Sequence, residues 1–436
     1  MTARRAERST IARRALVGGG ALAAILAASC SGVRTGAGAD AGSGGAPALG
    51  GRAGSSTTGG QGGGPAAGGG GGPGQGPGGG AGRVDGGGAE VPDGGVSVTD
   101  VRVVDATLPS GTWFNATGNL AGMSSECGNL SYLSARPGSG TLIAGVAQRG
   151  LWASDDAGMT WTRLGGGAGS ATITNRTGLI VYDPKTPQRF WEAGIYNSNG
   201  VYRTDDGGAT FVALGDAHHD DGVSVDFSDA ARRTLLAGGH EMAQTLYRSA
   251  DGGATWTNVG ANLPASAGKC NAPLVLDAQT HLVGCWDWDG SGGISRTTDG
   301  GQTWSRVYPS GVSSAQPLAA TDGAIYFALS GGRGLVKSTD GGATWTELGS
   351  AGGALGSTSP VQLPDGAIAT AGSSGVMVSR DGGSTWSAAT PALPYAPWGL
   401  AYSTGHHAFF VWHFSCGTGD IPVPADAIMG FVVAGP

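Results

Sequence analysis

Residues 154–161 read Ser-Asp-Asp-Ala-Gly-Met-Thr-Trp, and closely similar octapeptides occur five more times along the chain. The later copies begin at residues 204, 249, 297, 338 and 379, so neighbouring copies start 41 to 50 residues apart. The Asp and Gly residues of each copy suit a tight turn, in which Asp accepts local backbone hydrogen bonds and Gly adopts a positive φ. Short runs of aromatic and β-branched residues surround these turns, which favours strands over helices.

The spacing of the octapeptides matches the length of one four-stranded blade in a β-propeller. Counting from the copy at residue 204 predicts strands at residues 178–183, 189–194, 200–204 and 210–214. Counting from the copy at residue 338 predicts strands at residues 317–321, 324–329, 335–338 and 344–348. We therefore predict an all-β chain that forms a single β-propeller.

Six octapeptides account for six blades, and the segments left over can supply a seventh. These segments are residues 399–403, 407–412 and 427–433 near the C-terminus, with residues 98–104 as the fourth strand. Joining the two ends of the domain in one sheet would hide the sheet edges. We predict seven blades, with six as the alternative.

Composition separates this domain, residues 98–436, from what precedes it. The whole chain has 436 residues, 87 of them Gly, and a formal net charge of −7. Such a balance argues against a nucleic-acid-binding surface, which is usually strongly basic. Residues 31–97 are almost entirely Gly, Ala, Ser and Pro, and such a segment cannot bury enough apolar surface to fold. We interpret it as a disordered tether.

Residues 1–30 have the features of a secretory signal. Several arginines precede a short Ala-rich apolar run, and Leu26-Ala27-Ala28-Ser29-Cys30 resembles a bacterial lipobox. In that family the cysteine, here Cys30, is lipidated and becomes the first mature residue. The resemblance implies an exported monomer held at the cell membrane or outer membrane by its lipid alone, facing the periplasm or the outside.

The octapeptide resembles the Asp-box, or bacterial neuraminidase repeat, Ser/Thr-x-Asp-x-Gly-x-Thr-Trp. Sialidases, xyloglucan-active hydrolases, sortilin-like receptors and photosystem assembly factors carry similar repeats. The resemblance implies that each box joins the third and fourth strands of a blade, on the face away from the ligand, and that its aspartate is structural. The chain lacks the Arg-Ile-Pro motif of sialidases, so we expect no sialidase activity.

Four cysteines follow Cys30 in a chain that is expected to be exported, so disulfides are allowed. Cys270 and Cys285 flank a predicted hairpin that would place them opposite each other if residues 277–278 form its turn. Cys127 lies early in the domain and Cys416 late. Of the three pairings that four cysteines allow, we favour 270–285 and 127–416.

The resemblance places the ligand on the face opposite the boxes, which is built from loops between the second and third strands and between consecutive blades. Rare residue types collect in these loops. The acid–base candidates are Asp220, Asp221, Glu241, Asp287, His218 and His240. The substrate-binding candidates are Tyr196, Asn197, Trp286, Trp288, Trp398, Trp412, His413 and Arg176.

Three functions fit these residues. A glycoside hydrolase needs two carboxyl groups beside the scissile bond, here Asp220 or Asp221 with Glu241 or Asp287. A polysaccharide lyase would use histidines such as His218 and His240 for proton transfer. A non-catalytic module would use the same loops to bind protein or glycan. We favour an enzyme acting on a carbohydrate polymer or cell-surface glycan, most simply a hydrolase. No cofactor is required, and Ca²⁺ or Mn²⁺ is the alternative that histidines and nearby acids would allow.

Overall fold

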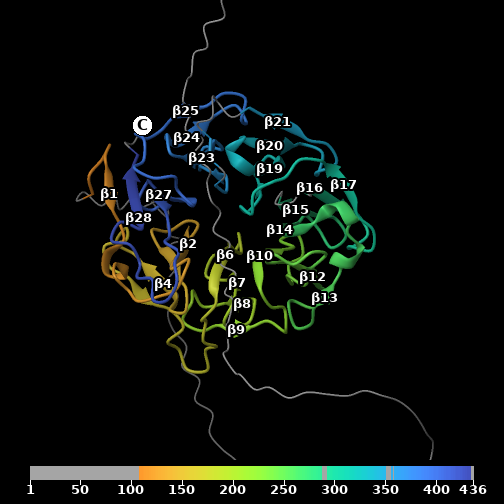
Figure 1. The fold of residues 1–436 in the computed structure, drawn as a ribbon, viewed down its shortest axis with the longest axis horizontal. Helices are drawn as coiled ribbons and strands as arrows, with labels where there is room; N and C mark the ends of the chain where they lie inside the picture. The colour runs from red at the N-terminus through yellow and green to blue at the C-terminus, as the bar shows by residue number, and fades with distance from the viewer. Residues whose placement is uncertain (1–107, 287–291, 350–354, 357, 434–436) are drawn as a thin grey trace, which may run out of the picture. The chain divides into compact units, whose positions relative to one another are not determined.

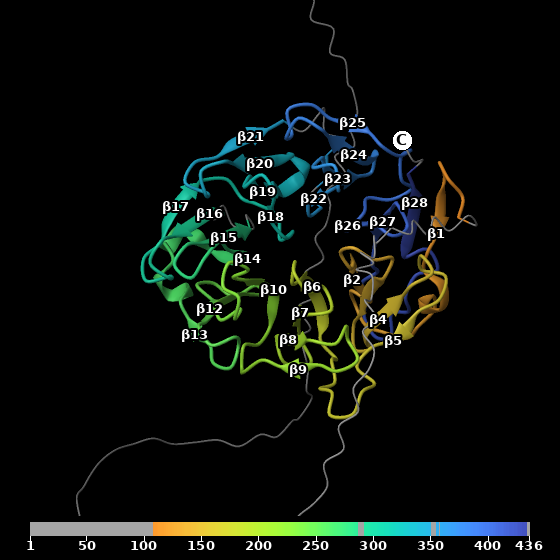
Figure 2. The ribbon, with the colours of Figure 1, turned by 180° about the vertical axis from the view of Figure 1, so that it is seen from behind.

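The computed structural model describes residues 108–286, 292–349, 355–356 and 358–433. Within these residues the strands form seven four-stranded antiparallel sheets, which are arranged as blades around a ring (Figures 1 and 2). The prediction of an all-β propeller with seven blades is confirmed, and the six-bladed alternative is wrong. In the same described part of the chain, none of the helices has the length and apolarity that crossing a membrane requires.

Six blades follow one another along the chain, each with its four strands in sequence order. Blade 1 contains β2 (Leu130–Ala135), β3 (Leu142–Val146), β4 (Gly150–Ser154) and β5 (Thr162–Arg163). Blade 2 contains β6 (Arg176–Tyr182), β7 (Phe190–Ile195), β8 (Val201–Thr204) and β9 (Val212–Ala213). Blade 3 contains β10 (Asp220–Val225), β11 (Leu235–Gly239), β12 (Leu246–Ser249) and β13 (Thr257–Asn258).

The next three blades repeat this plan. Blade 4 contains β14 (Lys269–Val275), β15 (His281–Trp286), β16 (Gly293–Thr297) and β17 (Ser305–Tyr308). Blade 5 contains β18 (Leu318–Ala319), β19 (Ile325–Ala328), β20 (Leu335–Ser338) and β21 (Thr346–Leu348). Blade 6 contains β22 (Val361–Gln362), β23 (Ile368–Gly372), β24 (Gly375–Ser379) and β25 (Ser387–Ala388).

Blade 7 joins the two ends of the described domain. Its strands β26 (Gly399–Ser403), β27 (Ala408–Trp412) and β28 (Ile428–Val432) come from the C-terminal end, as expected. Its outermost strand is β1 (Trp113–Asn115), which pairs with β28 (Figure 1). The prediction that residues 98–104 fill this place is wrong, and those residues lie outside the described part.

The aromatic side chains of β1 explain its place. Trp113 packs against Phe431, with ring centroids 5.2 Å apart, and Phe114 packs edge-on against Phe410 at 6.1 Å. A Cβ atom on Gly430 would lie 2.3 Å from the Phe114 ring, so only glycine leaves room for that ring. Burying these rings stabilises the closed ring of blades, because each aromatic side chain removes a large apolar area from water.

The core lies between neighbouring blades. Strands β7 and β11 are buried along their whole length, and strand β3 is as well. Their sequences are rich in Leu, Ile, Phe and small residues, which pack well when both faces of a sheet are covered. The outermost strands are short and largely exposed, as β5, β13 and β25 show. Stability is thus concentrated in the inner and middle strands.

Each octapeptide forms the turn between the third and fourth strands of a blade, and blade 3 shows its bonding. Asp251 Oδ1 accepts hydrogen bonds from Ser249 Oγ at 2.8 Å and from the Thr255 amide at 2.9 Å, while Oδ2 accepts from Thr255 Oγ1 at 2.6 Å. Ser249 Oγ in turn accepts from the Gly253 amide at 2.8 Å. Trp256 Nε1 donates to the Leu214 carbonyl of the preceding blade at 2.9 Å.

The same aspartate bonds recur in the other five turns, at Asp156, Asp206, Asp299, Asp340 and Asp381. Because the threonine side chain and amide donate to the ionised carboxylate, they lower the pKa of Asp251 to about 2. These six aspartates therefore hold turns together, and their carboxyl oxygens are already engaged.

Both predicted disulfides are present, Cys127–Cys416 and Cys270–Cys285. The hairpin that carries the second one differs from expectation. Val275 pairs with His281, whereas a two-residue turn at residues 277–278 would pair Val275 with residue 280. The turn of the hairpin is therefore one residue longer than predicted. A β-bulge at Asn271 compensates, and Cys270 still lies opposite Cys285.

Candidate functional site

Three loops of blades 2 and 3 meet on the face opposite the octapeptide turns. They connect β7 to β8, β9 to β10 and β11 to β12. Five residues of these loops have a positive φ without being glycine: Tyr196, Asn197, His219, Glu241 and Gln244. They make up more than half of the nine such residues in the described part of the chain. Left-handed backbone of this kind costs free energy and is enriched at functional sites.

A hydrogen-bonded chain of three side chains links these loops. Nδ1 of His240 lies 2.9 and 3.0 Å from the two carboxylate oxygens of Asp221. The opposite ring nitrogen, Nε2, lies 3.1 Å from the hydroxyl of Tyr196. A carboxylate only accepts hydrogen bonds, so Nδ1 carries a proton and donates it toward Asp221. In the neutral ring, Nε2 is then free to accept the hydrogen bond of the Tyr196 hydroxyl.

Asp221 is also held from blade 4, where Asn271 Nδ2 donates to its Oδ2 at 2.8 Å. Asp221 and Asn271 share a structural origin. Each is the bulged residue of the innermost strand of its blade, because the pairing register shifts between residues 220 and 222 and between residues 270 and 272. A bulge redirects the side chain of the unpaired residue. Two equivalent bulges on neighbouring blades thus bring these two side chains into contact.

Close backbone approach makes room for this arrangement. A Cβ atom on Gly178, the bulged residue of β6, would lie 2.3 Å from the Asp221 carbonyl oxygen. Any side chain there would push blade 2 away from Asp221. Glycine at position 178 therefore sets the spacing between strands β6 and β10. The positions of Tyr196 and Asp221 relative to each other depend on that spacing.

A second histidine completes the cluster. The ring of His219 lies 5.0 Å from the ring of His240 and 4.8 Å from that of Tyr196, between centroids. The His219 carbonyl accepts a hydrogen bond from the His240 amide at 2.7 Å. Burial, and then the nearby His240, lowers the pKa of His219, so this ring is neutral at physiological pH. The predicted candidate His218 is its exposed neighbour.

Charged groups surround the cluster unevenly. Arg176 lies over the Tyr196 ring, with its guanidinium carbon 5.5 Å from the centroid. Burial raises the pKa of the Tyr196 phenol, and the positive charge of Arg176 acts in the opposite direction. Glu241 Oε1 lies 3.8 Å from Nε2 of His240, and the Glu241 side chain is 31% exposed. A solvent-accessible carboxylate thus lies beside the imidazole.

Asp220 does not share this environment, although it was predicted as an acid–base residue beside Asp221. Its side chain is fully buried, and neither of its carboxyl oxygens has a hydrogen-bond partner among the described residues. A Cβ atom on Gly200 would lie 2.1 Å from Asp220 Oδ2, so the carboxyl group is packed against blade 2. Burial raises its pKa well above the ordinary value. We conclude that Asp220 is a core residue that substrate cannot reach.

The remaining candidates near blades 2 to 4 lie at the edge of the cluster or beyond the described residues. The exposed Asn197 donates from Nδ2 to Glu126 Oε1 at 2.9 Å. Trp286 is half-buried at the end of β15. Asp287 and Trp288 lie outside the described residues, so their predicted roles stay predictions.

The candidates of blade 7 form a separate group. Trp412 is 3% exposed, and its ring packs edge-on against Tyr132 at 5.5 Å. It is a core residue and offers no face to a sugar ring, contrary to prediction. Trp398 is 51% exposed and contacts Phe414. The His413 ring packs against the Tyr395 ring in a tilted arrangement, with ring centroids 4.2 Å apart.

Two buried residues were missed by sequence reasoning. Asn271 gives no local signal, because an asparagine in a predicted strand has no functional pattern. Glu192 lies in the apolar strand β7 with its side chain fully buried, where Asn175 Nδ2 donates to its Oε2 at 3.2 Å. Burial raises the pKa of Glu192 to about 8. A single carboxylate inside a run of buried residues could have flagged this position.

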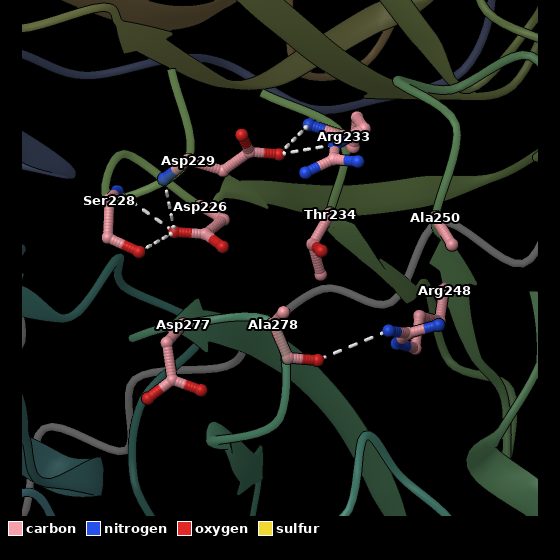
Figure 3. A pocket seen from close by; sticks show the side chains of 9 residues that line it. All are labelled: Asp226, Ser228, Asp229, Arg233, Thr234, Arg248, Ala250, Asp277 and Ala278. Atoms are coloured by element: carbon pink, nitrogen blue, oxygen red, sulfur yellow. Dashed lines mark hydrogen bonds and ion pairs between the residues drawn. The ribbon is translucent and has the colours of Figure 1, made fainter. Parts of the chain in front are cut away.

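The described residues contain no group of three or more His, Cys, Asp or Glu side chains arranged to hold a metal ion. A cavity of about 570 Å³ lies elsewhere, on the face that carries the octapeptide turns (Figure 3). Asp226, Asp229 and Asp277 line it, together with Arg233 and Arg248. Its carboxylates accept bonds from nearby backbone amides, and Asp229 also pairs with Arg233. These acids cap turns, so we place the candidate site at His240 and not in this cavity.

No family model matches the chain. A curated relative, a xyloglucanase from Paenibacillus sp, is 29% identical over 172 residues, which are 38% of this chain and 14% of the relative. The chain therefore matches only a small part of that enzyme.

Several solved structures are similar to this chain at low sequence identity. The GH74 xyloglucanase from Xanthomonas campestris is 19% identical with a TM-score of 0.44, covering 74% of this chain and 55% of that one. YCF48 bound to D1 peptide is 15% identical with a TM-score of 0.46, covering 75% of this chain and 99% of that one. The RRP9 WD40 repeats are 10% identical with a TM-score of 0.50, covering 74% and 100%. Similarity at this level concerns the fold alone.

Proposed function

We propose that this protein is a glycoside hydrolase that cleaves a carbohydrate polymer at the Tyr196–His240–Asp221 cluster. The observation that carries the proposal is the hydrogen-bonded chain from the Tyr196 hydroxyl through His240 to Asp221, with Glu241 beside it. A proton-transferring group held by a third residue is a recurring feature of catalytic sites. The partial relationship to a xyloglucanase supports glycan as the substrate class.

Hydrolysis of a glycosidic bond needs one proton delivered to the leaving oxygen and one removed from water. We assign the delivery to His240, because Asp221 fixes its ring through Nδ1 and Nε2 then faces the Tyr196 hydroxyl and Glu241. We assign the removal to the Glu241 carboxylate, which is accessible to solvent and must turn away from Nε2, now 3.8 Å from its Oε1, to leave room for the sugar and the attacking water. As the bond between the anomeric carbon and the leaving oxygen breaks, the doubly protonated ring of His240 gives its Nε2 proton to that oxygen and returns to the neutral ring with its proton on Nδ1. Water adds to the anomeric carbon and gives its proton to Glu241.

One observation favours a second reaction, β-elimination from a uronate-containing polymer. Arg176 lies over Tyr196, where its charge would neutralise a sugar carboxylate. Tyr196 or His240 would then remove the proton from the carbon next to that carboxylate. Against this, Glu126, Asp221 and Glu241 surround the same cluster, and their charges disfavour a polyanion. Hydrolysis of a neutral glycan is therefore the better-supported reaction.

The test is to incubate the purified protein with soluble xyloglucan and a panel of neutral and uronate-containing polysaccharides. New reducing ends without ultraviolet absorbance would support hydrolysis, whereas absorbance of unsaturated products would show elimination. Glu241→Ala should reduce turnover about 100-fold or more, the usual range for an acid–base residue, with an unchanged melting temperature. Asp216→Asn, in the exposed part of the β9–β10 loop, is the matched control and should keep full activity. Binding without turnover on any polymer would overturn the assignment as an enzyme.

The cellular setting is a further part of the proposal. We propose that the protein is exported as a monomer and held at a membrane through lipid on Cys30, with residues 31–97 as the tether. The apolar run and Cys30 of the N-terminus support this arrangement. Cys30→Ser should release the protein from the membrane fraction into the soluble fraction, whereas an unchanged distribution would refute lipid anchoring. Addition of EDTA tests the metal alternative, since a mechanism without metal predicts undiminished activity.

A further inference from the structure

We propose that blade 7 carries a second glycan-binding site, an aromatic platform that takes a neutral sugar chain. The platform consists of Tyr395, Trp398, His413, Phe414 and Asp426. It goes beyond the proposed function, because binding there requires no cleavage. Tyr395 and Trp398 lie in the loop before β26. The loop between β27 and β28 supplies His413, Phe414 and Asp426.

Trp398 is the residue that makes this surface unusual. It is 51% exposed, and the other large hydrophobic residues exposed to a similar degree in the described part of the chain are Met159 and Val212. Phe414 contacts it in an edge-on arrangement, with ring centroids 4.6 Å apart. An edge-on neighbour supports the indole and leaves ring surface open to solvent. Such an aromatic face can pack against the apolar C–H face of a sugar ring.

Backbone hydrogen bonds and a disulfide hold the two loops of the platform in place. The Trp398 amide donates to the Trp412 carbonyl at 2.7 Å, and the His413 amide donates to the Ala427 carbonyl at 3.0 Å. Beyond Phe414, the Ser415 carbonyl accepts from the Gly128 amide at 2.9 Å. The next residue forms the Cys127–Cys416 disulfide. Because both loops are fixed before a ligand arrives, little conformational entropy is lost on binding.

Polar groups lie at the edge of the aromatic surface and indicate the charge of the ligand. Nε2 of His413 lies 3.5 Å from Oδ1 of Asp426, whose side chain is 60% exposed. A carboxylate can accept hydrogen bonds from sugar hydroxyls but repels an acidic sugar. The aromatic face and the acidic edge together fit a neutral glycan.

The platform and the His240 cluster lie on different blades, and Arg176 links them, because its Nη1 donates to the carbonyl of Cys127, the disulfide partner of Cys416. Tyr196 and His240 belong to blades 2 and 3, and blade 1 separates blade 2 from blade 7 in the ring (Figure 2). The role of the platform is therefore measured as binding, separately from catalysis. A glycan-binding site outside the cleavage site would keep the protein on a polymer between cleavage events.

The experiment measures binding of xyloglucan oligosaccharide and cellohexaose to the full chain by calorimetry. All variants are made in the Glu241→Ala background, so that cleavage does not deplete the ligand. We expect Trp398→Ala to raise the Kd about tenfold, and Trp398→Tyr to retain binding within about threefold, since an aromatic face persists. Met159→Ala and Val212→Ala, which remove equally exposed apolar side chains elsewhere, should leave the Kd unchanged.

The outcomes separate this proposal from the proposed function. Loss of affinity in Trp398→Ala with an unchanged melting temperature supports the platform, even if the wild-type protein cleaves no polymer. Equal affinity in Trp398→Ala and its parent, or no binding of either neutral probe by the parent, overturns the platform. Tighter binding of an oligouronate than of cellohexaose would contradict the neutral ligand class.

Discussion

Asp221 holds His240 through Nδ1, with the two carboxylate oxygens 2.9 and 3.0 Å from that nitrogen. Both side chains are only partly exposed, 19% for Asp221 and 13% for His240. The pair therefore combines restricted solvent access with a fixed ring orientation. The same relationship makes His240 the centre of the cluster, because its other nitrogen faces both the Tyr196 hydroxyl and Glu241.

Asp221→Asn should abolish most of the activity without unfolding the protein. The amide removes the negative charge opposite Nδ1 and can donate where the carboxylate only accepts, so the ring loses its fixed orientation. We expect kcat to fall about 100-fold or more and the melting temperature to stay within about 3 °C, as for a partly exposed residue. Turnover at the wild-type rate would exclude the pair from the chemistry.

Asn271→Ala should have a smaller effect that is confined to kcat. Asn271 does not touch the acid–base atoms but donates to Oδ2 of Asp221, so it is a positioning residue. Loss of such a supporting bond typically costs about tenfold. Asn262→Ala is the matched control, since Asn262 also donates to a single acceptor, the Gly301 carbonyl, away from the cluster. Steady-state kinetics across the pH range would check both variants, and an effect on KM alone would argue against positioning.

Glu192→Gln should stabilise the protein at alkaline pH. Burial raises the folded-state pKa of Glu192 to about 8 from an ordinary 4.5. A raised pKa contributes stability that is fully present below pH 4.5 and is lost progressively as the pH rises to about 8. Gln mimics the neutral acid, so the melting temperature of the variant should fall less between pH 5 and pH 9. If the melting temperatures of wild type and variant fell equally between pH 5 and pH 9, that result would contradict the raised pKa of Glu192.

Asp251→Ala should destabilise blade 3, because three hydrogen bonds to the carboxylate disappear. We expect the melting temperature at pH 7 to fall by about 2 to 5 °C. The pKa is lowered to about 2, so the carboxylate stabilises the fold above pH 3.8 and this contribution is lost as the pH falls through about 2. The difference in melting temperature between wild type and variant should therefore become smaller at low pH. Asp216→Ala provides an exposed carboxylate as control, and an equal loss there would show that the turn bonds add nothing.

The repeat could be read from the sequence because each blade encodes its own turn. In blade 5, strand β20 (Leu335–Ser338) lies where the sequence predicted it, directly before its octapeptide. Prediction failed at the closing strand, where β1 begins at Trp113 and not near residue 98. That choice depends on a contact with Phe431, more than 300 residues away, which no local pattern reveals. The site was predicted only in outline for the same reason, since Asp220 and Asp221 look equivalent in sequence yet one is buried and the other bonds His240.

The sequence by itself determined the blades and their turns, because these features rest on residue types at short, regular spacings. Only the tertiary structure decided which polar side chains meet. Asp221 and Asn271 contact each other because bulges in two inner strands turn both residues out of the regular pairing. A bulge depends on how whole strands align across a sheet, and strand alignment is set by long-range packing between blades. The candidate chemistry therefore follows from packing that the linear pattern does not encode.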